Sequence, residues 1–141
     1  MPSVNQWFDR YGESHRDPLN KALHWICVPA ITWSVVAIAW WLSPYVALAL
    51  CAAALAFYAS LSPAIALGML AFVALVMASL AYLPVNLAWV AASVFVVAWI
   101  GQFAGHAVEG RKPSFVDDLK FLLIGPAWLL GFVYRRLRIR Y

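Results

Sequence analysis

The sequence has no Asp, Glu, Lys or Arg between Lys21 and Glu109, so the run from Ala22 to Val108 is uncharged. A charged side chain at the centre of a bilayer costs roughly 2.5–3.5 kcal/mol on insertion scales. A run of this length therefore excludes an ordinary soluble domain and predicts a membrane domain. The apolar content of 65% agrees with this and also excludes a disordered chain.

Other absences narrow the possible functions. The only cysteines, Cys27 and Cys51, lie in apolar segments, which predicts packing residues rather than a disulfide framework or a CxxC site. The sequence shows no glycine-rich phosphate loop and no nucleophile elbow, which argues against a nucleotide-binding protein and a serine hydrolase. Residues 1–21 are polar and lack an apolar core, so we expect no signal peptide, and the first membrane helix must direct insertion.

The basic residues do not form a pattern typical of nucleic-acid binding. The chain has ten Lys and Arg against six Asp and Glu, and four arginines follow an apolar stretch at the C-terminal end. Such a cluster is typical of an anchor on an anionic membrane surface, and a solvated tail is the alternative. The four residues are Arg135, Arg136, Arg138 and Arg140.

Prolines divide the uncharged run at intervals close to the length of a membrane-spanning helix. A bilayer core of about 30 Å is crossed by about 20 helical residues. Pro44, Pro63 and Pro84 are natural breaks between such helices. The short connections predict antiparallel hairpins in a small four-helix bundle. The expected spans are residues 23–42, 45–61, 64–82 and 85–105.

An even number of spans returns both ends of the run to the same side of the membrane. All charged residues then lie on that side, and the positive-inside rule makes it cytoplasmic. Both termini are therefore expected in the cytoplasm, at the inner membrane of a bacterium or the endoplasmic reticulum of a eukaryote. We predict an all-α polytopic membrane protein with a single domain over residues 1–141. It comprises a polar N-terminal segment (1–21), the spans (22–108) and an interfacial C-terminal segment (109–141).

The C-terminal segment contains one further apolar stretch, Phe121 to Tyr134, which Gly125-Pro126 interrupts. It is too short for an ordinary span. We expect an interfacial or re-entrant helical element that covers a site at the cytoplasmic face. A fifth crossing helix is the alternative, but it would place the C-terminal arginines outside, against the charge rule.

The chain has three histidines, His15, His24 and His106, and the predicted topology brings them to one face. Neutral imidazole is the commonest metal ligand and suits Fe, Zn or Cu. Three imidazoles with an open position, or with Glu109 or Glu13 as a further ligand, would suit iron that activates dioxygen. A structural polar cluster remains an open alternative at this point.

The residues next to His24 predict how the first membrane helix begins. Asp17 is a candidate N-cap with Pro18 at the first helical position. The helix then runs into the first span, and Asn20 and His24, four residues apart, share one of its faces.

The residues around His106 predict a second polar face. If the last span continues through His106, then Gln102, His106 and Glu109 lie on the same side of it. Gly110 and Pro113 would then end the helix. A His and a Glu three residues apart occur as ligands in carboxylate-bridged metal proteins.

These two segments together resemble the membrane 2-hydroxy fatty acid dioxygenases, a family that includes the fungal enzyme of phytosphingosine degradation. The resemblance covers nearly the whole chain. The matching residues in the first segment are Tyr11, His15, Asp17-Pro18, Asn20, His24 and Val28-Pro29. Those in the second segment are Gln102, Gly105-His106, Glu109 and Pro113.

The resemblance implies an Fe(II) enzyme that uses O2 to shorten a 2-hydroxy fatty acid by one carbon. It implies His15, His24 and His106 as iron ligands and Glu109 as a fourth ligand or the support of one. Asn20 and Gln102 would orient ligands through hydrogen bonds. Two departures leave the ligand set and substrate open. Arg16 stands where the fungal enzyme has a second His, and the stretch after His106 is one residue shorter.

The hypothesis is therefore an iron dioxygenase that acts on a 2-hydroxy acid and O2 among membrane lipids, without a nucleic-acid partner. Arg111, Lys112 and Lys120 would pair with the fatty carboxylate or only fix the topology. One alternative is a non-enzymatic membrane assembly or lipid-binding protein in which the histidines form a structural clasp. Another is a haem protein with His24 and His106 as axial ligands.

Overall fold

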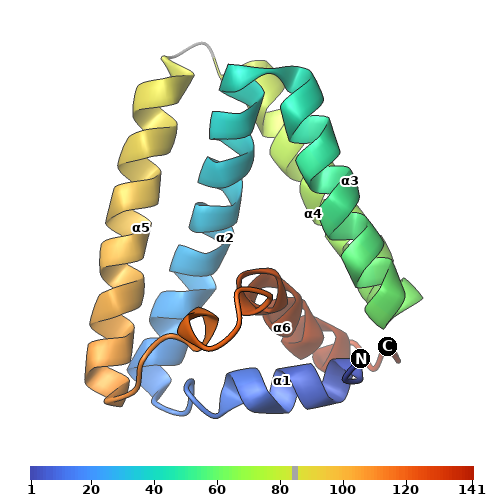
Figure 1. The fold of residues 1–141 in the computed structure, drawn as a ribbon, viewed down its shortest axis with the longest axis vertical. Helices are drawn as coiled ribbons and strands as arrows, with labels where there is room; N and C mark the ends of the chain where they lie inside the picture. The colour runs from blue at the N-terminus through green and yellow to red at the C-terminus, as the bar shows by residue number, and fades with distance from the viewer. Residues whose placement is uncertain (84–85) are drawn as a thin grey trace.

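The computed structural model describes residues 1–83 and 86–141, which form α-helices and one 3₁₀ helix without any strand (Figure 1). This confirms the all-α prediction. The helices are α1 (Val4–Gly12), α2 (Pro18–Leu42), α3 (Pro44–Leu61), α4 (Pro63–Tyr82), α5 (Leu87–Glu109) and α6 (Phe121–Arg136), with η1 (Ser114–Val116) before α6.

Four of these helices, α2 to α5, are long and apolar enough to cross a membrane. The predicted boundaries at Pro44 and Pro63 are confirmed, because each proline takes the first position of a helix that a serine caps. The Ser43 side chain accepts from the Tyr45 N–H, and Ser62 caps α4 in the same way. The predicted break at Pro84 lies outside the described residues.

The four long helices form two pairs that separate toward one end of the molecule (Figure 1). Helix α5 packs along α2, and α3 packs along α4, while α2 and α3 meet at their shared turn. The space between the pairs holds α6, which contacts α1, α2 and α4. The spans therefore form an open arrangement completed by α6 rather than a closed four-helix bundle.

Two glycines explain the close approach of α2 and α5. A Cβ added at Gly101 would lie 2.7 Å from Cys27 Sγ, and one added at Gly105 would collide with Asn20 Oδ1. Small residues at this spacing let two helix backbones approach. This contact brings the start of α2 and the end of α5, which carry His24 and His106, next to each other.

Helix α1 is a feature that the sequence analysis missed, because it read residues 1–21 as a polar segment. Val4, Trp7, Phe8 and Tyr11 are buried, and their spacing places them on one helical face. A capping box between Ser3 and Gln6 begins the helix. The apolar face packs on α6, with the Trp7 and Phe121 ring centroids 5.2 Å apart.

Helix α6 is continuous from Phe121 to Arg136 although Pro126 lies inside it. It is not one of the four candidate spans. The Tyr58 hydroxyl donates to the Leu123 carbonyl at 2.7 Å, and the Tyr134 hydroxyl donates to the Ala64 carbonyl at 2.6 Å. These bonds attach α6 to the adjoining ends of α3 and α4.

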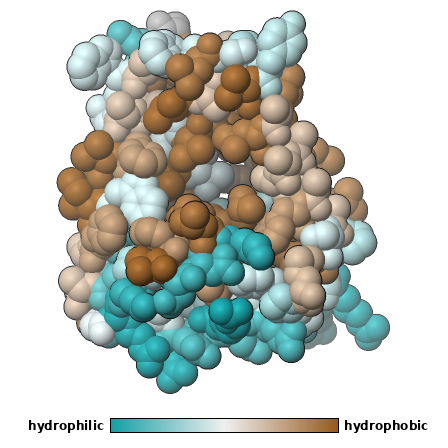
Figure 2. All heavy atoms as spheres, in the orientation of Figure 1, coloured by the Kyte–Doolittle hydropathy of each residue, from teal (hydrophilic) through white to brown (hydrophobic). Residues whose placement is uncertain are grey.

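The surface divides into a polar end and an apolar remainder, as Figure 2 shows. Hydrophilic residues gather at the end where α1 lies, and both termini lie at that end (Figure 1). The predicted return of the chain to its starting side is therefore observed, with α1 at the polar end and α6 packed on α1.

Candidate metal centre

The three histidines lie together in the fold. His15 follows α1, His24 lies in the second turn of α2, and His106 lies in the last turn of α5. They are 2%, 0% and 4% exposed, and one potential ligand atom from each lies within 4.8 Å of the others. The gathering that the topology predicts is thus observed, whereas the role of the histidines as metal ligands stays a prediction.

Backbone carbonyls fix which nitrogen of two of the rings carries hydrogen. His15 Nδ1 lies 2.6 Å from the Tyr11 carbonyl oxygen, and His24 Nδ1 lies 2.8 Å from the Asn20 carbonyl oxygen. A carbonyl only accepts, so each Nδ1 must donate. In the neutral rings, Nε2 then keeps a lone pair, which is the arrangement found in metal-ligating histidines.

The two Nε2 atoms of His15 and His24 face each other at 2.9 Å. Two lone pairs at this distance repel unless a proton or a cation lies between them. Burial and the neighbouring His24 imidazole lower the pKa of His15 to about 3, so His15 is neutral near pH 7. A cation that accepts both lone pairs would therefore suit this pair.

His106 adds a third donor to the same space. Its Nδ1 is buried and has no hydrogen-bond partner in the described residues. The His106 ring centroid lies 4.8 Å from that of His15 and 4.9 Å from that of His24. Three neighbouring buried imidazoles, one of them with an unpartnered nitrogen among the described residues, fit a metal ion.

Glu109 contacts the backbone near the histidines. Its carboxylate accepts the Arg16 N–H at 2.8 Å and the Asp17 N–H at 2.7 Å. The Asn20 side chain donates to the same carboxylate at 3.2 Å. Glu109 therefore ties the end of α5 to the loop that carries His15 and to the start of α2. Its predicted role as a ligand stays a prediction.

The other predicted site residues are placed differently. Asn20 orients His24 through its backbone carbonyl, and its side chain also donates to the Ser14 carbonyl. Gln102 is buried one turn before His106 and makes no hydrogen bond to a histidine in the described residues. Glu13 and Arg16 are exposed. Arg16 stands where the fungal enzyme has its second histidine, so this chain has no fourth imidazole at that position.

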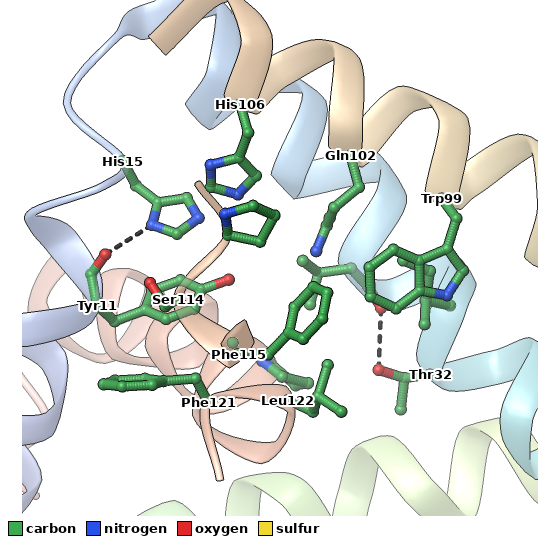
Figure 3. A pocket seen from close by; sticks show the side chains of 15 residues that line it. Tyr11, His15, Thr32, Trp99, Gln102, His106, Ser114, Phe115, Phe121 and Leu122 are labelled. Carbon is green, nitrogen blue, oxygen red and sulfur yellow. Dashed lines mark hydrogen bonds between the residues drawn. The ribbon is translucent and has the colours of Figure 1, made fainter. Parts of the chain in front are cut away.

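A small cavity of about 40 Å³ adjoins the histidines, as Figure 3 shows. His15, His106 and Gln102 line one part of it, and no charged side chain lines it among the described residues. The remaining walls come from α1, α2, α5, α6 and the segment around η1. They are Tyr11, Val28, Ile31, Thr32, Trp99, Pro113, Ser114, Phe115, Phe121, Leu122, Gly125 and Pro126.

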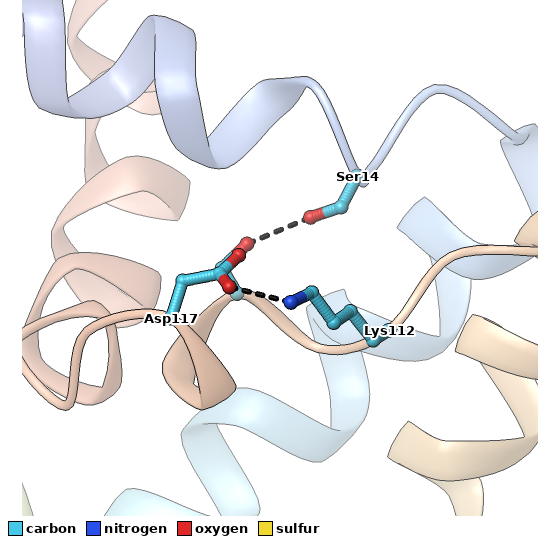
Figure 4. Close-up of polar contacts among 4 residues, drawn as sticks. Ser14, Lys112 and Asp117 are labelled. Carbon is cyan, nitrogen blue, oxygen red and sulfur yellow. Dashed lines mark hydrogen bonds and ion pairs between the residues drawn. The ribbon is translucent and has the colours of Figure 1, made fainter.

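A more polar pocket lies on the other side of Ser14 and Ser114. The two hydroxyl oxygens are 2.7 Å apart, and Ser14 also lies 3.2 Å from His15 Nδ1. Arg111 and Lys112 line this polar pocket, not the cavity beside the histidines. The Lys112 ammonium is 2.6 Å from the Asp117 carboxylate, as Figure 4 shows.

Tyr11 matches the family pattern, but its contacts with His15 were not predicted from the sequence. Its ring stacks on His15, with centroids 4.0 Å apart and planes 13° apart, and its carbonyl fixes the His15 tautomer. Trp128 packs against the other rings at 5.1 Å from Tyr11 and 5.4 Å from His15. The burial of Tyr11 on the apolar face of α1 was the available signal.

Comparisons with known proteins identify the family of this chain. No curated protein and no solved structure showed a match to the chain. One family model matches residues 1–137, which is nearly the whole chain, and its description is 2-hydroxy-palmitic acid dioxygenase Mpo1-like. With its three gathered histidines and four apolar helices, the chain belongs to this Mpo1-like family.

Proposed function

We propose that this protein is an Fe(II)-dependent dioxygenase that shortens 2-hydroxy fatty acids by one carbon at the cytoplasmic face of a membrane. The observation that carries the proposal is the convergence of three buried imidazoles, two of them with fixed tautomers, beside a largely apolar cavity. The family match supports the class of substrate and reaction. The excess of basic residues at the polar end supports a cytoplasmic orientation.

The three imidazoles supply a neutral nitrogen donor set. Three protein ligands leave positions free for substrate and O2. Iron(II), when bound, would supply a Lewis-acidic and redox-active centre there. A 2-hydroxy acid offers two adjacent oxygens, on its hydroxyl and its carboxylate, to such a centre.

The surrounding residues hold the donor set in place. The carbonyls of Tyr11 and Asn20 orient two rings, and Glu109 keeps the His15 loop against α5. The mainly apolar walls of the cavity suit the first carbons of an acyl chain. Since α6 lines this cavity and packs on α1 at the polar end, a lipid-derived acid would keep its tail in the bilayer while its head reaches the histidines.

Metal content of the purified protein tests this proposal. The wild type and a His106→Ala variant are purified anaerobically in detergent, and their metals are measured by elemental analysis. We expect about one iron per chain in the wild type and loss of that iron in the variant. Oxygen uptake with 2-hydroxy acids, and none with 3-hydroxy acids of the same length, would then establish the reaction class. A folded wild type that takes up no iron on reconstitution would contradict the proposal.

A structural clasp is the second candidate, and the 2.9 Å contact between His15 and His24 favours it, because a shared proton would also bridge the two rings. Such a protein would purify without metal and would tolerate His→Gln substitutions. The geometry does not favour a haem. The His24 and His106 ring centroids are only 4.9 Å apart, which leaves too little space for a porphyrin between the two rings.

A further inference from the structure

The side chain of Gln102 is buried without a hydrogen-bond partner. It is 7% exposed, and its Oε1 contacts no donor in the described part of the chain. A buried amide left in this state costs about 1–3 kcal/mol. The carboxamide lines the cavity that His15 and His106 also line, and Figure 3 shows it projecting into that space. A ligand in the cavity would supply the missing partner.

The position of Gln102 along α5 divides the cavity into two regions. It lies four residues before His106 on the same face of the helix, which is about 6 Å farther from the cytoplasmic end. Figure 3 shows His15, His106 and Tyr11 on one side of Gln102 and Trp99 and Thr32 on the other, and most of the remaining lining residues are apolar.

Of the other neutral polar groups of the cavity, two hydroxyls are engaged, whereas the Tyr11 hydroxyl makes no hydrogen bond among the described residues. The Thr32 hydroxyl donates to the Val28 carbonyl at 2.9 Å, and the Ser114 hydroxyl bonds with Ser14. Trp99 Nε1 is also buried without a partner, but an indole N–H only donates. The carboxamide of Gln102 both donates and accepts, so it suits a hydroxyl group.

We propose that Gln102 selects the 2-hydroxyl group of the substrate, an inference that rests on the proposed function for the identity of the ligand. In a 2-hydroxy acid, the hydroxyl is on the carbon next to the carboxylate, on the side of the tail. A ligand with its carboxylate at the histidines and its tail beyond Gln102 places this hydroxyl beside the carboxamide. The hydroxyl donates to Gln102 Oε1, and its oxygen keeps lone pairs for the metal centre.

The same arrangement rejects an acid that lacks the hydroxyl. An unsubstituted acyl chain would bury the Gln102 carboxamide against CH2 groups and leave it without a partner. Sites built to hydrogen-bond a substrate hydroxyl discriminate strongly against the analogue that lacks it. Gln102 therefore acts as a positioning and specificity-determining residue rather than as the support of a histidine.

Equilibrium binding under anaerobic conditions tests this role. Radiolabelled 2-hydroxyhexadecanoate and hexadecanoate are bound to detergent-solubilised wild type, Gln102→Met and Ser93→Ala, with iron content measured on each. Met keeps the length of Gln but removes both polar atoms. Ser93→Ala is the matched control, since Ser93 is an exposed polar residue of the same helix. Gln102→Leu carries the same prediction if Gln102→Met does not fold.

We expect the wild type to prefer the hydroxy acid and Gln102→Met to lose about 10- to 100-fold of that preference while it keeps its iron. Ser93→Ala should keep the preference. An unchanged preference in Gln102→Met would overturn the inference. So would a variant that loses its iron and binds both acids more weakly by the same factor. A wild type that does not distinguish the two acids would overturn it as well.

The binding experiment, combined with the oxygen-uptake assay of the proposed function, separates this inference from that function. A wild type that prefers the hydroxy acid but consumes no O2, with the preference lost in Gln102→Met, supports the role of Gln102 and contradicts the dioxygenase. A wild type that takes up no iron contradicts the dioxygenase, and the preference measured on the iron-free proteins still decides the role of Gln102.

Discussion

The carboxylate of Glu109 accepts the backbone N–H of Asp17 at 2.7 Å, which joins residues 92 positions apart in the chain. The second carboxylate oxygen accepts the neighbouring N–H of Arg16. Two backbone donors from one turn of chain thus converge on one side chain from the end of another helix. This contact holds the loop that carries His15 against the helix that carries His106.

Replacing Glu109 should weaken the metal centre without removing a histidine. Each hydrogen bond to a charged group contributes about 1.5–3 kcal/mol, and loss of such supporting contacts typically costs 10- to 100-fold in metal affinity. We expect Glu109→Ala to lower both the midpoint of thermal unfolding and the affinity for iron, measured by competition with a chelator. Glu13→Gln, at an exposed position, is the control. Wild-type affinity in Glu109→Ala would show that the contact does not support the site.

The stability of the metal-free protein should fall on acidification. Burial lowers the pKa of His15 to about 3, whereas an imidazole in an unfolded chain has a pKa near 6.5. Between these values, the unfolded chain binds a proton that the folded chain does not. The stabilising difference is therefore full above about pH 6.5 and is lost progressively as pH falls toward 3.

The expected size of this loss in unfolding free energy follows from the binding of one proton to the unfolded chain. From pH 7.5 to 5.5, His15 should account for about 1.4 kcal/mol of the loss in unfolding free energy. Unfolding of metal-free wild type and His15→Gln at both pH values measures this term, and the variant should show the smaller dependence. Equal dependence in the two proteins would contradict a neutral, buried His15.

The contact between α2 and α5 should not tolerate a larger residue at Gly105. A Cβ there would collide with Asn20 Oδ1, and overpacking of a well-packed contact costs typically about 1–3 kcal/mol. We expect Gly105→Val to lower stability and to lose bound iron, because it separates His24 from His106. Ala104→Val, on the adjoining exposed face, should do neither. Iron content and thermal unfolding in detergent provide the readout, and normal iron binding in Gly105→Val would refute this account.

The attachment of α6 should depend on its tyrosine contacts. Tyr134→Phe removes the hydroxyl that donates to the Ala64 carbonyl, and we expect a loss of about 1 kcal/mol in unfolding free energy. Tyr58→Phe should act similarly through its contact with Leu123. Tyr45→Phe, at an 82% exposed position, should leave stability unchanged. If all three variants unfold alike, the two hydrogen bonds do not hold α6.

The sequence predicted the features that local signals encode. The uncharged run and its prolines define the spans, and Asp17 with Pro18 marks the start of α2, as the structure confirms. Gly110, in the left-handed conformation at φ 72°, ends α5 as expected. The gathering of the histidines followed from an even number of spans.

Features that arise only from tertiary contacts could not be predicted in the same way. The partners of the Glu109 carboxylate are backbone amides, and no side-chain pattern in the sequence identifies such donors. Whether Gln102 Oε1 finds a hydrogen-bond partner depends on the side chains packed around it, and among the described residues it has none. The burial of α1 could have been predicted, because Trp7, Phe8 and Tyr11 share a helical face, but the polar residues between them concealed it.

The placement of His106 on the last long helix has a consequence for biosynthesis. His15 and His24 emerge from the ribosome early, but their third partner is made only after two more membrane helices. Helix α6, which lines the cavity, is made later still. The centre therefore cannot be complete during most of translation, and a metal would be acquired after the last membrane helix is inserted.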